Sequence, residues 1–181
     1  AAAIGGLRRR VADMNIRIRN ETTADIEAIS QVTRAAFLTL PISRHTEQFI
    51  IAALRAAGAL TVSLVAEIEH KVVGHIAFSP VTISDGSPGW YGLGPVAVAP
   101  ELHRRSIGSA LVRRGLSELK ALGADGCMLV GDSGFYERFG FKNHPELVHE
   151  GVPPEYFLCL PFGDSRPSGT VRFHAAFAAT G

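Results

Sequence analysis

The sequence predicts an α/β protein with a mixed sheet that has helices on both faces. Apolar, β-type runs follow one another in the first half of the chain, whereas strands and helices alternate in the second half. A short, wholly apolar run at Gly126–Val130 is typical of a strand in the middle of a sheet. The predicted order is therefore β-α-α-β-β-β-α-β-α-β, without an internal repeat.

Six segments have the composition of strands. Ile16 and Ile18 alternate with arginines, as in a half-buried strand. A tight polar turn at Glu69–His70 joins two longer β-type runs. The predicted strands are Asn15–Asn20, Leu60–Glu69, Lys71–Ile83, Trp90–Ala99, Gly126–Val130 and Tyr156–Leu160.

Apolar residues at helical spacing, together with boundary residues, predict the helices. Thr22 and Asp25 have the spacing of a capping box before the first helix, which Pro41 ends. Gly58 and Gly123 close two further amphipathic stretches. After the first helix, the predicted helical segments are Arg44–Ala57, Ser106–Leu122 and Ser133–Phe139.

Length and composition predict one compact domain. The 181 residues are 46% hydrophobic and 19% charged, which suits a soluble protein with a single core. We expect a disordered N-terminal extension over residues 1–13, one domain over 14–163, and a C-terminal tail over 164–181 that packs on it. The tail contains a short apolar element, Val171–Ala178, whose type the sequence leaves open.

Charge, hydropathy and cysteine usage exclude several classes of partner. The net charge is +1, and without Arg8, Arg9, Arg10 and Asp13 the chain has 15 basic and 16 acidic residues, so no basic face for nucleic acid is expected. No apolar run approaches the roughly 18 residues of a membrane span. Cys127 and Cys159 lie in apolar surroundings without metal-ligand spacing, as in a reducing, cytoplasmic setting. Neither a metal nor a membrane is therefore expected.

The most informative segment is Val96–Leu111. A β-type run stops at Pro100, a short basic turn follows, and an amphipathic helix begins directly after it. This layout directs free backbone N–H groups and the positive end of a helix dipole at one point, where a phosphate or pyrophosphate binds. Arg104 and Arg105 add positive charge there. The segment predicts a phosphate-bearing ligand.

Val96–Leu111, followed by Gly131–Phe141, resembles the GNAT superfamily of acyl-CoA-dependent N-acyltransferases, and most of all its YhbS-like branch of small bacterial proteins. Other matching stretches are Val73–Val81, Gly92–Val98, Gly115–Leu119 and Phe173-His174. The resemblance implies a GNAT-like fold whose mostly antiparallel sheet is splayed at the cofactor site. It also implies acetyl-CoA as co-substrate and an amine acceptor that the sequence does not identify, and it leaves a homodimer open.

Two registers of the family's phosphate turn, Gln/Arg-x-x-Gly-x-Gly/Ala, compete. Arg105–Ala110 matches the residue types of the motif. The number of residues from Val98 and from Gly115 instead favours His103–Gly108. In that register His103 replaces Gln/Arg and Ser106 replaces the first glycine. A serine there narrows the gap for the pyrophosphate, although its hydroxyl could donate to a phosphate oxygen. The cofactor-binding residues that the resemblance implies are Val96, Ala97, Val98, His103, Arg104, Arg105, Ser106, Ile107, Gly108, Ser109, Gly131 and Phe139.

The resemblance also implies catalytic roles. Tyr136 matches the tyrosine that protonates the departing thiolate, as a general acid. Glu67 or His75 is the candidate base for the substrate amine, and the alternatives are a water chain as the base or an ordinary packing role for these side chains. The resemblance also implies that the acceptor site borders the first helix pair, near Arg34, Arg44, His45 and Glu47, for which a solvated surface position is the alternative. His174 could close over this site from the tail, and the alternative is an incidental position there.

Three functions are compatible with these residues. The favoured one is an N-acetyltransferase that acts on a primary amine of a small molecule or protein, by direct attack in a ternary complex. The alternative is a non-catalytic acyl-CoA-binding module or sensor, which His103 and Ser106 favour. A dinucleotide-binding role, suggested by Gly92-Leu93-Gly94, is weak because these glycines precede the strand end instead of following it.

Overall fold

The computed structural model describes residues 15–104 and 106–181. The expected disordered extension over 1–13 lies outside these residues, and so does Arg105. Within them, no helix is long and apolar enough to span a membrane. No group of three or more His, Cys, Asp or Glu side chains in these ranges could hold a metal ion.

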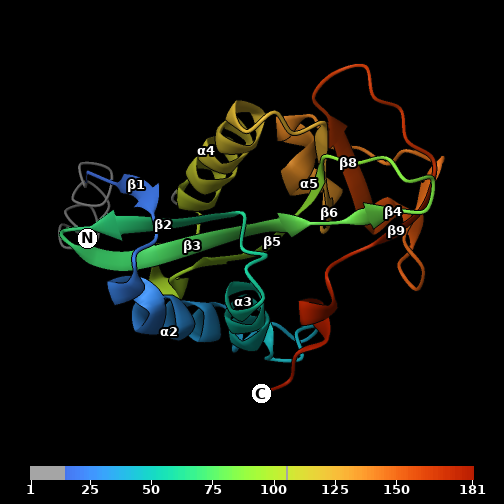
Figure 1. The fold of residues 1–181 in the computed structure, drawn as a ribbon. Helices are drawn as coiled ribbons and strands as arrows, with labels where there is room; N and C mark the ends of the chain where they lie inside the picture. The colour runs from blue at the N-terminus through green and yellow to red at the C-terminus, as the bar shows by residue number, and fades with distance from the viewer. Residues whose placement is uncertain (1–14, 105) are drawn as a thin grey trace.

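A six-stranded sheet forms the centre of the molecule, in the order β1-β2-β3-β5-β6-β8 (Figure 1). Only β5 and β6 are parallel, and every other neighbouring pair is antiparallel. The strands are β1 (Arg17–Asn20), β2 (Val62–Ile68), β3 (Lys71–Pro80), β5 (Trp90–Val98), β6 (Gly126–Val130) and β8 (Phe157–Pro161). The mixed, mostly antiparallel sheet is thus confirmed.

Helices cover both faces of this sheet. In Figure 1, α4 (Ile107–Ala121) lies on one side, and α2 (Ile26–Phe37) and α3 (Glu47–Ala56) lie on the other. The alternation of β2 explains this, because Leu64 and Ala66 pack in the core that includes α4, whereas Val65 packs with α2 and α3. The capping box predicted at Thr22 and Asp25 is present, ahead of α2.

The sheet is splayed between its two parallel strands. Pairing of β5 with β6 runs from Trp90–Gly126 to Gly92–Met128 and then stops, while β5 stays paired with β3 as far as Val98. A register shift faces Gly94 and Pro95, and a β-bulge of this kind bends a strand. Within the described ranges, the edge of β5 that faces β6 therefore has no neighbouring strand beyond Gly92.

A second, three-stranded sheet was not predicted. The expected strand Lys71–Ile83 divides at Val81 into β3 and β4 (Thr82–Ile83), and β4 turns away to pair with β9 (Gly169–Arg172). The short strand β7 (Leu147–Val148) pairs with the other edge of β9. The apolar element expected at 171–178 is partly this strand and partly a 3-10 helix over Ala175–Ala178, which packs on α3.

Candidate active site

Two cavities lie along the free edge of β5. The first has a volume of about 440 Å³ and lies where α4 begins. Its lining consists of Val98, Leu102, His103, Arg104, Ser106, Ile107, Gly108, Ser109, Phe135 and Arg138. These residues come from the end of β5, the turn before α4, the first turn of α4, and the helical segment after β6. Among the residues that the structure describes, no acidic side chain lines this cavity, so the cavity suits an anion.

The turn before α4 has two residues in the left-handed region. Arg104 has φ 65° and Ser106, the N-cap of α4, has φ 64°. The Ser106 side chain makes no capping hydrogen bond to the residues described. The first backbone N–H groups of a helix have no partner within the helix, so they are available to a ligand in this cavity. Ser106 therefore has the conformation that glycine prefers, without the side-chain bond that would favour serine.

His103 fixes the turn to the strand before it. Its Nε2 donates to the Val98 carbonyl oxygen at 2.8 Å. Arg138 lies over the ring of Phe135, with its guanidinium carbon 4.8 Å from the ring centroid. Arg104 and Arg138 thus bring positive charge to the cavity wall from two separate segments.

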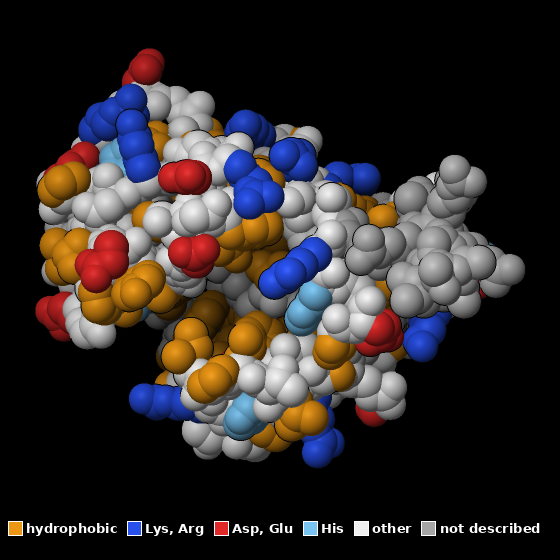
Figure 2. Space-filling model, turned by 180° about the vertical axis from the view of Figure 1, so that it is seen from behind, with side chains coloured by type: hydrophobic (Ala, Val, Ile, Leu, Met, Phe, Trp, Pro, Cys, Tyr) orange, Lys and Arg blue, Asp and Glu red, His pale blue; other side chains and the backbone are white. Residues whose placement is uncertain are grey.

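The second cavity is larger, at about 760 Å³, and mainly apolar. Its lining consists of Phe37, Glu47, Ile50, Leu93, Gly94, Pro95, Val96, Val130, Tyr136, His149, Arg172, Phe173, His174, Ala175, Phe177 and Ala178. Figure 2 shows one face of the molecule hollowed, with hydrophobic side chains in the hollow. Val96 lines this cavity and Val98 lines the first. These two residues are two positions apart on β5, so the cavities reach the strand at points about 7 Å apart.

Tyr136 extends from the short helix α5 (Ser133–Tyr136) into the second cavity. Its ring packs edge-on against Phe135, with 4.8 Å between centroids, and against Phe141. A side chain at Gly131 would collide with this ring, since an added Cβ would lie 2.7 Å from it. Burial raises the pKa of Tyr136 to about 12, so the phenol stays protonated at neutral pH.

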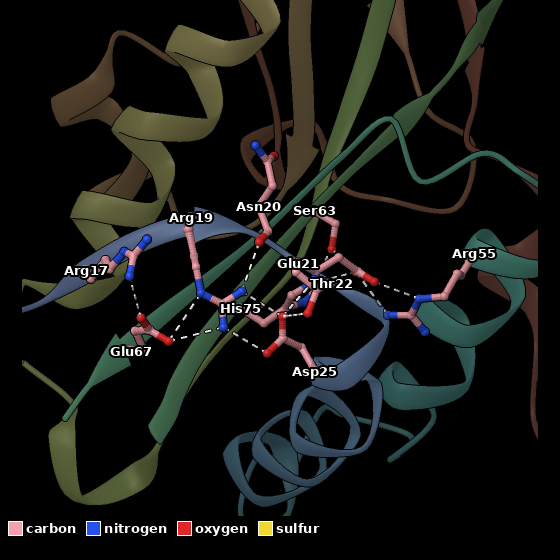
Figure 3. A network of polar contacts seen from close by, with 10 residues as sticks. All are labelled: Arg17, Arg19, Asn20, Glu21, Thr22, Asp25, Arg55, Ser63, Glu67 and His75. Carbon is pink, nitrogen blue, oxygen red and sulfur yellow. Dashed lines mark hydrogen bonds and ion pairs between the residues drawn. The ribbon is translucent and has the colours of Figure 1, made fainter. Parts of the chain in front are cut away.

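The two tentative bases lie outside both cavities, in the polar network of Figure 3. Glu67 accepts hydrogen bonds from Arg19 at 3.1 and 3.2 Å. Arg19 also donates to Asp25 at 2.7 Å, so it lies between two carboxylates. His75 is wholly buried, its Nε2 lies 2.7 Å from the Ser63 hydroxyl, and burial lowers its pKa. Both side chains have partners in the sheet.

The remaining predicted residues divide between lining and packing positions. Of the predicted turn residues 103–109, the six that the structure describes line the first cavity. Ala97 is buried and lines neither cavity. Gly131 and Phe139 also line neither. Of the four residues expected near the acceptor, only Glu47 lines the second cavity, and His174 lines it from the tail.

Sequence reasoning missed several lining residues. Arg138 and Phe135 flank Tyr136 in the helical segment, so their closeness to a predicted site residue was a usable signal. His149 and Arg172 had no such signal, because the second sheet brings them to the cavity from segments without a regular pattern.

Residues 60–143 match the family model described as the acetyltransferase (GNAT) domain. The chain is 33% identical over 126 residues to the uncharacterized N-acetyltransferase YhbS of Escherichia coli K12, covering 69% of this chain and 72% of that protein.

Two solved structures are similar over most of the chain. A GNAT family acetyltransferase from Brucella melitensis in complex with acetyl-CoA is 49% identical, with a TM-score of 0.81 and coverage of 91% of this chain and 99% of that one. The Escherichia coli YhbS structure in complex with CoA is 29% identical, with a TM-score of 0.84 and coverage of 93% and 94%.

Proposed function

The chain belongs to the GNAT family of N-acetyltransferases, and on this premise we propose that it transfers the acetyl group of acetyl-CoA to a primary amine in a ternary complex. The observation that carries the proposal is the free edge of β5 between two cavities of opposite character. The basic cavity suits the phosphates of the donor, and the apolar cavity suits an acceptor. Acetyl-CoA-bound and CoA-bound relatives of the same fold support this assignment.

The donor's pyrophosphate is assigned to the first cavity. The backbone N–H groups of Ser106, Ile107, Gly108 and Ser109 are the orphan donors of the first turn of α4, and the helix dipole favours an anion at this end. Arg104 and Arg138 would add ionic contacts. The His103 bond to Val98 keeps the turn at a fixed distance from the strand, which preorganises the site.

The thioester is assigned to the free edge of β5, at Val96–Val98. Strand backbone groups without a neighbouring strand are available to hold the pantetheine arm and to donate to the thioester oxygen. A donor aimed at the developing oxyanion contributes on the order of 3 kcal/mol to transition-state stabilisation.

The reaction needs no covalent enzyme intermediate. The amine nitrogen forms a bond to the thioester carbon while the carbonyl π electrons move to oxygen. The carbonyl then re-forms, the C–S bond breaks, and the nitrogen loses a proton. The departing sulfur gains a proton in place of the one that the nitrogen loses, so the products are the amide and the CoA thiol. Holding both reactants side by side supplies the rate advantage of proximity.

Tyr136 is the proposed donor to the leaving sulfur. With a pKa of about 12, its phenol is a weaker acid than an ordinary thiol, whose pKa is about 8.5. The phenol therefore stabilises the thiolate by a hydrogen bond as the C–S bond breaks. The phenol transfers its proton to sulfur only when it receives, in exchange, the proton that the attacking nitrogen releases. The cysteines play no part, because burial raises the pKa of both Cys127 and Cys159 and keeps them as thiols.

Calorimetric titration with acetyl-CoA, CoA and NAD tests this proposal first. We expect saturable one-site binding of acetyl-CoA and CoA and none of NAD, followed by acetylation of amines in a screen. Absence of acetyl-CoA binding would overturn the proposal. Tight binding without turnover over a broad amine panel would indicate the acyl-CoA-binding sensor instead.

A further inference from the structure

Glu47 places an unsatisfied carboxylate oxygen at the wall of the apolar cavity. It is the first residue of α3, and its Oε1 accepts a hydrogen bond from the Ser43 hydroxyl. Its Oε2 is buried and has no hydrogen-bond partner among the residues that the structure describes. A buried polar atom of this kind is costly unless a ligand or water satisfies it.

Three basic side chains line this cavity, those of His149, His174 and Arg172. His149 Nδ1 donates to the Val171 carbonyl oxygen at 3.0 Å, and His174 Nδ1 accepts from the Ala176 N–H at 3.0 Å. Arg172 lines the cavity from β9, in the second sheet. No ion pair within the described ranges includes Glu47. Its carboxylate is therefore open to a cation that comes from a ligand.

The rest of the cavity wall is mainly apolar, so it favours a ligand whose uncharged part is apolar. Aromatic and aliphatic side chains from α2, α3, β6 and the tail surround the space, among them Phe37, Ile50, Val130, Phe173 and Phe177. A cavity of about 760 Å³ exceeds what a bare ammonium ion needs and is within the range of pockets that bury small organic ligands.

We propose that the acceptor is a small primary amine on an apolar, aromatic-sized body, and that Glu47 holds its ammonium group and then takes its proton. This inference rests on the proposed acetyl transfer and adds the group missing from it, since neither Glu67 nor His75 lines the cavity. One N–H proton moves to Oε2 of Glu47, and the nitrogen's freed electron pair attacks the thioester carbon. The protonated carboxyl group afterwards releases its proton to water.

Binding of 2-phenylethylamine to the CoA-saturated full chain provides the test, since CoA has no acetyl group and turnover cannot interfere. Calorimetry should show saturable binding of 2-phenylethylamine. It should show at least tenfold weaker binding of 2-phenylethanol, which lacks the ammonium, and of spermidine, which lacks the apolar body.

Substitutions at Glu47 locate the ammonium site. Glu47→Gln should weaken 2-phenylethylamine binding about tenfold or more, while Glu47→Asp, which keeps the charge, should restore most of it. Glu27→Gln is the matched control, because Glu27 lies on α2 and lines neither cavity, and it should change nothing. Acetyl-CoA affinity should be the same in all variants, which also shows that they are folded.

Equal amine affinity in Glu47→Gln and the unmodified chain would overturn the inference, and so would equal affinity for spermidine or 2-phenylethanol. In those cases acetyl-CoA binding with turnover of other amines would leave the proposed function standing. Failure of the unmodified chain to bind acetyl-CoA would overturn the proposed function and this inference together.

Discussion

The Ser63 hydroxyl oxygen lies 2.7 Å from Nε2 of His75, and both side chains are buried. Glu21 accepts a hydrogen bond from the same hydroxyl and two from Arg55, at 2.9 and 3.0 Å. Figure 3 shows Glu21 between Ser63 and Arg55. This chain of contacts ties β2 and β3 to α3 and to the segment after β1. His75 therefore belongs to the structural interior, not to the cavity wall.

Ser63→Ala should destabilise the protein by about 1–3 kcal/mol without changing its affinity for acetyl-CoA. The substitution removes one hydrogen-bond partner from the buried imidazole of His75 and one from the half-buried carboxylate of Glu21. Urea unfolding and calorimetry measure the two quantities. Ser117→Ala, at an exposed position of α4, is the control and should change stability by less than about 0.5 kcal/mol. A stable variant that has lost turnover would contradict the structural role.

Acid should destabilise the protein through Glu21. Burial opposes ionisation of this carboxyl. The nearby His75 imidazole, whose Nε2 lies 3.8 Å from Oε1, and the hydrogen bonds from Arg55 and Ser63 outweigh burial and lower its pKa from 4.5 to about 2. Because the folded-state pKa is the lower one, this stabilisation is complete above about pH 4.5. It is lost as the pH falls from there toward 2.

Urea unfolding at a series of pH values from 7 to 2 measures this loss, which should be on the order of 3 kcal/mol for Glu21. Glu21→Gln removes the titrating group. It should be less stable at pH 7 and should show a shallower fall in unfolding free energy below pH 4.5. An identical pH profile in the two proteins would show that Glu21 does not contribute.

Ser106→Gly should stabilise the protein by about 0.5–1 kcal/mol and bind acetyl-CoA at least as tightly. Ser106 has φ 64°, which costs a residue with a Cβ about 1–2 kcal/mol, and no capping bond of its side chain offsets this among the described contacts. Thermal or urea unfolding with calorimetry tests both effects. Ser117→Gly, inside α4, should be destabilised instead. Weaker acetyl-CoA binding by Ser106→Gly would show that the serine hydroxyl contacts the phosphate.

Tyr136→Phe should lower kcat about a hundredfold and leave acetyl-CoA affinity unchanged, because the ring packing survives and only the proton donor is lost. Steady-state kinetics and calorimetry separate the two effects. Tyr156→Phe is the control, since Tyr156 is 48% exposed and lines neither cavity. Because the acid form is lost only as the pH rises through about 12, Tyr136 should cause no fall in kcat between pH 7 and 10.

Glu67→Gln should retain kcat within about twofold but lose about 1–3 kcal/mol of stability. Glu67 accepts from Arg19 and lies 3.6 Å from the Arg17 guanidinium, outside both cavities, so its charge serves the sheet. Turnover of an accepted amine and urea unfolding check this. A large loss of kcat with normal stability would identify Glu67 as the base after all.

Local sequence patterns determined the helices and the strands of the six-stranded sheet. The alternation around Ile16, the capping box at Thr22 and the glycine after α4 predicted boundaries that the structure reproduces within a few residues. The layout around the start of α4 was also predictable, because a strand end, a basic turn and a helix start are contiguous in the chain. These features depend on neighbouring residues alone, so the sequence contains them directly.

Tertiary structure alone decided what the apolar cavity is made of. Glu47, Tyr136, His149 and Phe173 come from four segments far apart in the chain, and pairing of β9 with β4 and β7 brings the tail to the cavity. Those strands are two to four residues long, too short for a periodic signal. The sequence likewise offered Glu67 and His75 as bases by residue type. Only the register of β1, β2 and β3 placed them among partners in the sheet, because burial and ion pairing are properties of the whole fold.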